Sequence, residues 1–244
     1  MTEFVNYAHR GASAYAPENT FAAFYLGWQM GANGIETDIQ CTRDGVPVLF
    51  HDSDMKRITG TAVRICDLTY DELTAYDVGS YKGEQFRGER VPSLEEFLHH
   101  FARKGLQLAL EIKQRNIEDA IAPLIRKYCI PEEVVVTSFQ WDSLLAFRRK
   151  MPEIRTGWLS RNESEELVAA MKSAGIWQYC PNASTWTDGW HQHFREAGFS
   201  IRPWGVKDES LMARMLEMGV DGMTVNFPDK LEAARKTCHD APKL

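Results

Sequence analysis

The sequence predicts an α/β protein of the (β/α)₈ TIM-barrel type with a small insertion after the second strand. Short apolar runs alternate with longer amphipathic stretches along the whole chain, as expected for βα units and a parallel sheet. Eight such runs are present, which favours a closed barrel over an open, doubly wound sheet. The length of 244 residues is also close to that of a single barrel of this kind, about 250 residues, so we expect one domain over residues 1–244.

The predicted elements follow from these runs in order. The eight predicted strands are 4–9, 34–39, 106–112, 133–138, 154–160, 176–181, 199–204 and 220–225. Helices are predicted between them, over 21–30, 117–128, 141–150, 165–173, 188–197 and 209–218. Several of these stretches open on Ser, Asn or Asp and close on Gly, the residues typical of helix starts and stops.

One apolar run, 46–51, does not fit the alternation. It follows the second strand after a very short connection, whereas a parallel crossover needs about a dozen residues or more. Asp44-Gly45 is a hairpin signal, so we expect 46–51 to fold back antiparallel on 36–41. That pairing predicts that His51 lies opposite the Glu36–Asp38 pair, within one residue of register.

The polar segment 53–90 interrupts the barrel pattern. Capping boxes are predicted at Thr69-x-x-Glu72 within it and at Ser93-x-x-Glu96 just after it. We interpret 53–90 as a small inserted subdomain that caps the barrel mouth. A long surface loop containing a helix is an equally weighted alternative.

Composition restricts the class of partner. The formal net charge of −6 disfavours a nucleic-acid binder, although an acidic protein can still hold an anion at a local basic site. Five scattered cysteines without CxxC spacing are typical of reduced thiols in a cytosolic protein. No secretory leader and no membrane-spanning run is evident, so we expect a cytoplasmic protein with a small-molecule substrate.

Charged residues on the predicted strands indicate a metal site. Glu36 and Asp38 are two apart on one strand and share a face, and Glu111 and Lys113 repeat that arrangement on another. Both pairs lie at the C-terminal ends of strands, where barrel active sites are built. Three close carboxylates would repel one another without a cation, and oxygen ligands suit Mg²⁺, Ca²⁺ or Mn²⁺ better than Zn²⁺. A structural ion pair with Lys113 is the alternative.

Two histidines and an arginine add the means for acid-base chemistry on a phosphate. His9 closes the first strand and His51 closes the hairpin, and imidazoles titrate near neutral pH. Arg10 offers a planar fork suited to phosphate oxygens, while Lys113 offers a point charge. A metal site with these groups predicts phosphate-ester cleavage.

The chain resembles the glycerophosphodiester phosphodiesterase family. The resemblance rests on blocks spread along the chain: AHRGASAYAPENTFAAF (8–24), GANGIETDIQCTRDGVPVLFHD (31–52), VPSLEEFL (91–98), LALEIK (108–113), TSF (137–139) and EMGVDGMTVNFPD (217–229). The combination of HRG…PENT with E-x-D…DG-x-P-V-x-x-HD is the most specific part.

The resemblance implies a TIM barrel of the phospholipase-C-like phosphodiesterase type, with one divalent cation, Mg²⁺ or Ca²⁺. It implies hydrolysis of glycerophosphodiesters to sn-glycerol 3-phosphate and an alcohol. It assigns the cation to Glu36, Asp38 and Glu111, and the acid-base roles to His9 and His51. It assigns substrate or phosphate binding to Arg10, Lys113 and Trp204.

Two departures from the family pattern lie near the barrel mouth. Asn226 stands where the family's last strand usually has its first aspartate, and Trp204 is followed by Gly-Val-Lys instead of Thr-Val-Asn. Three alternative functions stay open. They are a lysophospholipase D, an enzyme that stops at a cyclic phosphate, and a non-catalytic barrel that binds phosphate esters.

Overall fold

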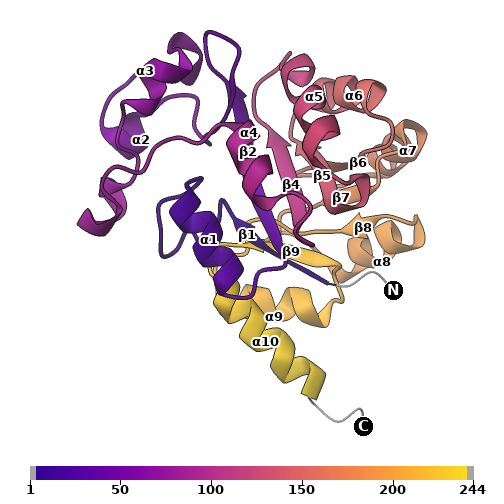
Figure 1. Cartoon of the computed structure of the whole chain (residues 1–244). Coiled ribbons are helices and arrows are strands. Elements are labelled where there is room, and N and C mark those ends of the chain that lie inside the picture. Colours follow the sequence, from indigo (N-terminus) through magenta and orange to yellow (C-terminus); the bar gives the residue numbers. More distant parts are fainter. Residues whose placement is uncertain (1–3, 241–244) are drawn as a thin grey trace.

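Eight parallel strands and their connecting helices form a nearly closed barrel (Figure 1). The structure is a computed structural model and describes residues 4–240. Its strands are β1 (Val5–His9), β2 (Gly34–Cys41), β3 (Pro47–Leu49), β4 (Gln107–Ile112), β5 (Val134–Ser138), β6 (Arg155–Leu159), β7 (Gln178–Cys180), β8 (Ser200–Ile201) and β9 (Gly222–Val225). Apart from the hairpin strand β3, each of them overlaps one of the eight predicted strands.

The strand order runs β8-β7-β6-β5-β4-β2-β1-β9, and every neighbouring pair on this path is parallel. The path nearly closes on itself through a parallel bridge between Val206, just after β8, and Val225 at the end of β9. The predicted TIM barrel is therefore confirmed. All eight C-terminal strand ends point to one mouth, which is where this fold assembles side chains from distant parts of the sequence.

The helices cover the outside of the barrel. They are α1 (Phe21–Gln29), α4 (Leu94–Phe101), α5 (Glu118–Tyr128), α6 (Trp141–Lys150), α7 (Glu165–Ala174), α8 (Asp188–Glu196), α9 (Glu209–Glu217) and α10 (Pro228–Asp240). Side-chain caps begin several of them, including Ser164 for α7 and Asp208 for α9, as the sequence predicts. Outward-facing strand residues such as Ile35 and Ile39 pack against these helices in the main apolar core.

The hairpin after β2 forms as predicted. β3 pairs antiparallel with β2, with Ile39 opposite Leu49, and the Phe50 N–H then donates to the Asp38 carbonyl at 3.1 Å. His51 follows immediately, so the hairpin brings it level with the acidic part of β2. A β-turn that needs a left-handed residue at Gly45 (φ 82°) makes this reversal.

Short helical segments fill the chain between β3 and α4. They are α2 (Lys56–Thr59), η1 (Ile65–Asp67), α3 (Tyr70–Thr74), η2 (Ser80–Lys82) and η3 (Glu84–Phe86). Both predicted capping boxes, at Thr69 and Ser93, are present. The segment packs on an apolar cluster that includes Met55, Ile58 and Leu73, and it lies to one side of the barrel, at the upper left in Figure 1.

The structure also bears on the cysteines and on the predicted lack of a membrane-spanning segment. Cys41, Cys129 and Cys180 are buried free thiols and Cys66 is half-buried, while the side chain of Cys238 is outside the described part. Within residues 4–240, no helix is long and apolar enough to cross a membrane.

Candidate active site

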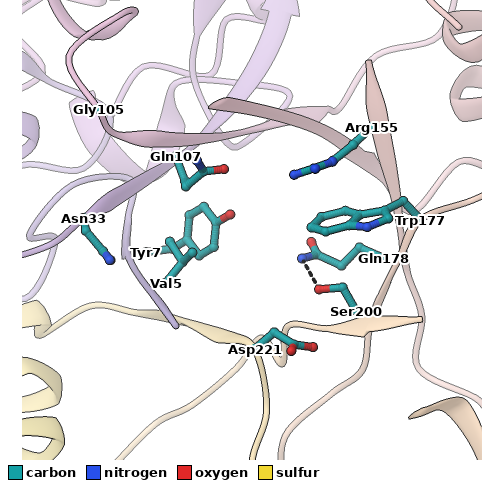
Figure 2. Close-up of a pocket in the computed structure, with 10 residues that line it drawn as sticks. All are labelled: Val5, Tyr7, Asn33, Gly105, Gln107, Arg155, Trp177, Gln178, Ser200 and Asp221. Atoms are coloured by element: carbon teal, nitrogen blue, oxygen red, sulfur yellow. Dashed lines mark hydrogen bonds between the residues drawn. The ribbon is translucent and has the colours of Figure 1, made fainter. Parts of the chain in front are cut away.

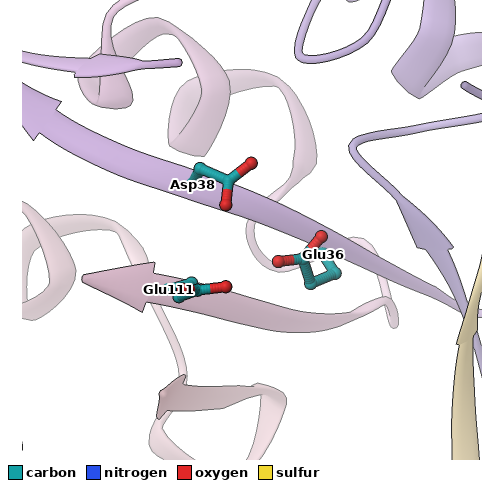
Figure 3. Close-up of side chains that lie close together, drawn as sticks. All are labelled: Glu36, Asp38 and Glu111. Atoms are coloured by element: carbon teal, nitrogen blue, oxygen red, sulfur yellow. The ribbon is translucent and has the colours of Figure 1, made fainter. Parts of the chain in front are cut away.

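Three carboxylates meet inside the barrel mouth. Glu36 and Asp38 point inward from β2, and Glu111 points toward them from the neighbouring strand β4 (Figure 3). One oxygen from each lies within 4.8 Å of the others, and all three residues are buried. The register that sets Asp38 beside Glu111 makes this convergence a direct result of the parallel pairing. The predicted acidic cluster is therefore present.

The cluster is electrostatically strained. Burial, together with the negative charges of Asp38 and Glu111, raises the pKa of Glu36 to about 8. Burial and the charge of Asp38 raise the pKa of Glu111 to about 7. Although burial opposes it, the charges of Arg10 and Lys113 lower the pKa of Asp38 to about 2. Glu36 and Glu111 thus resist ionisation near neutral pH unless further positive charge lies beside them.

Two cations compensate part of this charge. Arg10 Nε lies 2.9 Å from Asp38 Oδ2, and Lys113 Nζ lies 3.0 Å from Glu111 Oε1 and 3.6 Å from Asp38 Oδ1. These ion pairs alone could explain why the carboxylates of Asp38 and Glu111 are tolerated inside the barrel. They do not account for Glu36, whose Oε2 lies 3.8 Å from Nε2 of the His9 ring.

The donor set fits a hard divalent cation. All three side chains offer oxygen, and Asp38 Oδ1 is buried without a hydrogen-bond partner among the described residues. Lys113 Nζ lies 3.6 Å from this oxygen, and a further cation among the three carboxylates would offset their repulsion. The site is therefore compatible with a divalent metal ion.

The backbone conformation after β1 explains the His9-Arg10-Gly11 sequence. Arg10 adopts a left-handed backbone (φ 55°) directly after β1, which turns its side chain into the mouth, and Gly11 follows at φ 80°. A Cβ on Gly11 would lie 2.4 Å from the backbone carbon of Ala23. Only glycine allows this close approach of the turn to helix α1.

The turn formed by the PENT sequence, residues 17–20, makes three side-chain hydrogen bonds that hold the site and the first helix in place. Glu18 accepts from Arg10 Nη1 at 2.9 Å, and the side-chain amide of Asn19 donates to Asp38 Oδ2 at 3.0 Å. Thr20 caps the N-terminus of α1 by accepting from the Ala23 N–H. The turn therefore fixes both Arg10 and Asp38 against the first helix.

His9 has an amide partner. Its Nδ1 lies 2.6 Å from Asn226 Oδ1, in the loop after β9, while its Nε2 faces Glu36. Because an amide oxygen only accepts, Nδ1 carries the proton and Nε2 is left as the free acceptor. Burial, then the charge of Arg10, lowers the pKa of His9 to about 4, so the ring is neutral at neutral pH.

His51 has a carboxylate partner instead. Its Nδ1 lies 2.7 Å from Asp52 Oδ1, and Asp52 Oδ2 accepts from Arg57 Nε at 2.6 Å. The other two nitrogens of Arg57 donate to Glu18 at 2.7 and 2.8 Å. Burial lowers the pKa of His51, and the Asp38 and Asp52 carboxylates oppose that shift. Arg57, which belongs to α2, thus links the inserted segment to both His51 and the turn that holds Arg10.

Trp204 lies at the same mouth, just after β8. Its indole N–H donates to the Cys180 carbonyl at 3.1 Å and, more weakly, to the Ser160 carbonyl at 3.3 Å. The thiol of Cys180 is inside the barrel; burial raises its pKa to about 11, and the charges of Glu111 and Glu36 add to the effect. Trp204 is therefore fixed across the C-terminal ends of β6 and β7, at the barrel mouth.

A separate cavity of about 230 Å³ opens at the other end of the barrel. Figure 2 shows its lining, which comes from the N-terminal ends of the strands: Val5, Tyr7, Asn33, Gly105, Gln107, Arg155, Trp177, Gln178, Ser200 and Asp221. None of the predicted site residues lines this cavity. The chemistry therefore gathers at the opposite face.

All eight predicted site residues lie at or beside the C-terminal end of the barrel, on β1, β2 or β4 or within three residues after a strand. Sequence reasoning gave no site role to four residues that contact them, Glu18, Asn19, Asp52 and Asn226, or to Arg57, which contacts Glu18 and Asp52. The HD dipeptide and the PENT block carried a signal for Asp52 and Glu18. Nothing in the local sequence around Arg57 indicates that it reaches the mouth.

Known proteins are similar to this chain in sequence and in fold. Residues 9–230 match the model of the glycerophosphoryl diester phosphodiesterase family. The chain is 32% identical to a glycerophosphodiester phosphodiesterase of Caldanaerobacter subterraneus, over 92% of this chain and 94% of that one. It is 30% identical to one of Bacillus altitudinis, over 94% and 97%.

A solved structure is similar over its whole length. The phosphodiesterase OLEI02445 of Oleispira antarctica, solved with the product sn-glycerol-3-phosphate, superposes with a TM-score of 0.90 at 26% identity. The superposition covers 95% of this chain and 96% of that one.

Proposed function

The chain belongs to the glycerophosphoryl diester phosphodiesterase family and is a glycerophosphodiester phosphodiesterase, and we propose that it releases sn-glycerol 3-phosphate and an alcohol with the help of one divalent cation. The observation that carries this proposal is the meeting of Glu36, Asp38 and Glu111 beside His9. The product found with the Oleispira antarctica relative supports the same product here. The cytoplasmic location stays a prediction from the sequence.

Glu36, Asp38 and Glu111 would hold the cation, which we propose to be Mg²⁺ or Ca²⁺, with Mn²⁺ as a further candidate. When bound, it would supply positive charge to the phosphodiester oxygens, commonly worth several kcal/mol in the transition state. Arg10 and Lys113 stand beside the same carboxylates and are suited to bind the remaining phosphate oxygens.

The two histidines divide the proton transfers according to their partners. His9 is neutral with a free Nε2, because Asn226 fixes its proton on Nδ1. We therefore assign His9 as the base that takes the proton from the attacking oxygen. Burial lowers the pKa of His51, and its pairing with the Asp52 carboxylate opposes that shift by favouring the charged ring. We assign His51 as the acid that protonates the departing alcohol. Either water or the glycerol 2-hydroxyl could be the attacking group in this scheme.

The inserted segment 53–90 would act as a cap of the mouth with a positioning role. Arg57 bonds Asp52 and Glu18 together, so it holds the carboxylate that orients His51 and the one that orients Arg10. Tyr81 and Lys82 add contacts from the same segment, to the Glu18 N–H and the Ser13 carbonyl. This favours a cap over an unattached surface loop.

The test is release of glycerol 3-phosphate, followed with a dehydrogenase-linked assay, from a panel of glycerophosphodiesters with and without chelator. We expect turnover that EDTA abolishes and that Mg²⁺ or Ca²⁺ restores. His9→Ala and His51→Ala should each keep the wild-type melting temperature and lose turnover by a factor of about 10² or more. Near wild-type turnover in either variant would refute the assignment of that histidine. Phosphorus NMR of the products distinguishes complete hydrolysis from a cyclic phosphate.

A further inference from the structure

An aromatic pair at the barrel mouth is covered by an arginine. Phe139, just after β5, meets Trp204, just after β8, edge to face with ring centroids 5.2 Å apart. The guanidinium of Arg161, two residues after β6, lies 5.0 Å from the centre of Trp204 and 5.6 Å from that of Phe139. The three side chains form one patch, which we call the Arg161 patch.

The Arg161 patch lies at the same end of the barrel as the acidic cluster. All three residues follow the C-terminal ends of strands, and the connection after β5 also reaches the site, since the Gln140 side chain donates to the Lys113 carbonyl at 2.6 Å. The inserted segment lies on the other side of the mouth, beside β2 and α1 (Figure 1). The Arg161 patch therefore lies on the side of the mouth away from the insertion.

The charge of Arg161 is unpaired. Among residues 4–240 its partners are the two rings, and it takes part in no ion pair. Glu163 is the acid closest to it along the chain, but that carboxylate accepts from the buried Tyr179 hydroxyl at 3.2 Å. Arg161 itself is exposed. An exposed, unpaired guanidinium beside a phosphodiester site is available for an anionic or hydroxyl-rich group.

The same geometry disfavours a quaternary ammonium. Such a cation binds best over an open aromatic face, and Arg161 already occupies the Phe139–Trp204 pair with a positive charge. Bringing choline there would require displacing the guanidinium or placing two positive charges side by side.

We propose that the alcohol half of the substrate lies against the Arg161 patch, and that the enzyme prefers diesters whose alcohol is anionic over those whose alcohol is a quaternary ammonium. This inference rests on the proposed function and adds its substrate class. A head group that carries a second phosphodiester fits the fork of Arg161, and glycerophosphocholine does not.

The test compares kcat/KM for bis(glycerophospho)glycerol, whose leaving alcohol carries a phosphodiester, with kcat/KM for glycerophosphocholine. The variants are Arg161→Gln, Arg161→Glu and the matched control Arg155→Glu. Arg155 begins β6, the strand that Arg161 follows; it stacks on Trp177 at 4.6 Å and faces the opposite end of the barrel. We expect Arg161→Glu to lower the ratio of the two values about tenfold, Arg161→Gln to lower it less, and the control to leave it unchanged.

Each other outcome overturns the inference. An unchanged ratio in Arg161→Glu excludes contact with the head group. An equal loss on both substrates assigns Arg161 to the glycerophosphate half that they share. A similar ratio change in Arg155→Glu would mean that only net charge matters. If the wild type turns over neither diester nor any other of the panel, the proposed function itself fails, which is a distinct result. Melting curves check that the substitutions at Arg161 and Arg155 leave the fold intact.

Discussion

Glu36→Gln should stabilise the metal-free protein while removing its response to metal. The carboxylate is 3% exposed and faces two others. Glutamine keeps nearly the same shape and an oxygen that can accept from the Arg10 N–H, which now reaches Glu36 Oε2 at 3.3 Å. The substitution therefore removes a charge without opening a cavity.

The size of the effect follows from the pKa of Glu36. Folding raises it from 4.5 to about 8, so an acid that ionises readily in the unfolded chain resists ionisation in the folded one. The resulting penalty is absent below pH 4.5, grows as the pH rises and is complete above about pH 8. Between pH 4.5 and pH 7 the penalty grows over about 2.5 pH units at about 1.36 kcal/mol each, so that it is about 3 kcal/mol at pH 7. For a chain of this size that corresponds to roughly 6–12 °C in melting temperature.

Thermal melting in EDTA at pH 7 and pH 4.5 measures this difference. We expect Glu36→Gln to melt higher than the wild type at pH 7 and to lose most of that advantage at pH 4.5. Mg²⁺ or Ca²⁺ should raise the melting temperature of the wild type much more than that of the variant. Glu217→Gln, an exposed change of the same charge on α9, is the control. A variant no more stable than the wild type at pH 7, or equally favoured at both pH values, would refute the reasoning.

Three further predictions concern residues around the site. Arg57→Ala should lower kcat about tenfold with little change in melting temperature, because the ion pairs of Arg57 are partly exposed. The control Arg43→Ala, which loses an exposed ion pair at 2.9 Å, should not change kcat. An equal loss of kcat in both variants would refute a positioning role for Arg57. Asn226→Ala should lower kcat about tenfold or more with KM nearly unchanged, because the proton of His9 is then no longer fixed on one nitrogen. Asn226→Asp should retain much of the wild-type rate. An unaffected kcat in the alanine variant would contradict this role of Asn226. Gly11→Ala should lower the free energy of unfolding by about 2–4 kcal/mol, because the new methyl group meets Ala23 at φ 80°, and an unchanged denaturation midpoint would show that the turn can relax.

The barrel and its acidic cluster could be predicted from the sequence because both depend on local periodicity. Alternation marks each strand, and residues two apart on a strand must share a face. Asp44-Gly45 marks the hairpin, which is why His51 could be expected beside β2. These features need no knowledge of which helix or loop packs above the strands.

The partners of those residues could not be predicted in the same way. Asn226 meets His9 across 217 positions, and Arg57 meets Glu18 across 39. Such contacts depend on the path of loops after the strands are in place. Arg202 is a further case: it lies in an apolar run, yet its side chain is 1% exposed inside the barrel, where Nε donates to Gln178 Oε1 at 2.9 Å. A lone arginine in a strand pattern gives no sign of facing inward.

The turn over residues 17–20 affects how mutations in this protein should be interpreted. Its consecutive side chains contact Arg10, an acidic β2 side chain and the start of a helix. Substitutions there will impair folding yield and turnover together, so a loss of activity in a cell-based screen does not by itself identify a reacting group. Purified variants at these positions need both an unfolding curve and a rate before either effect is assigned.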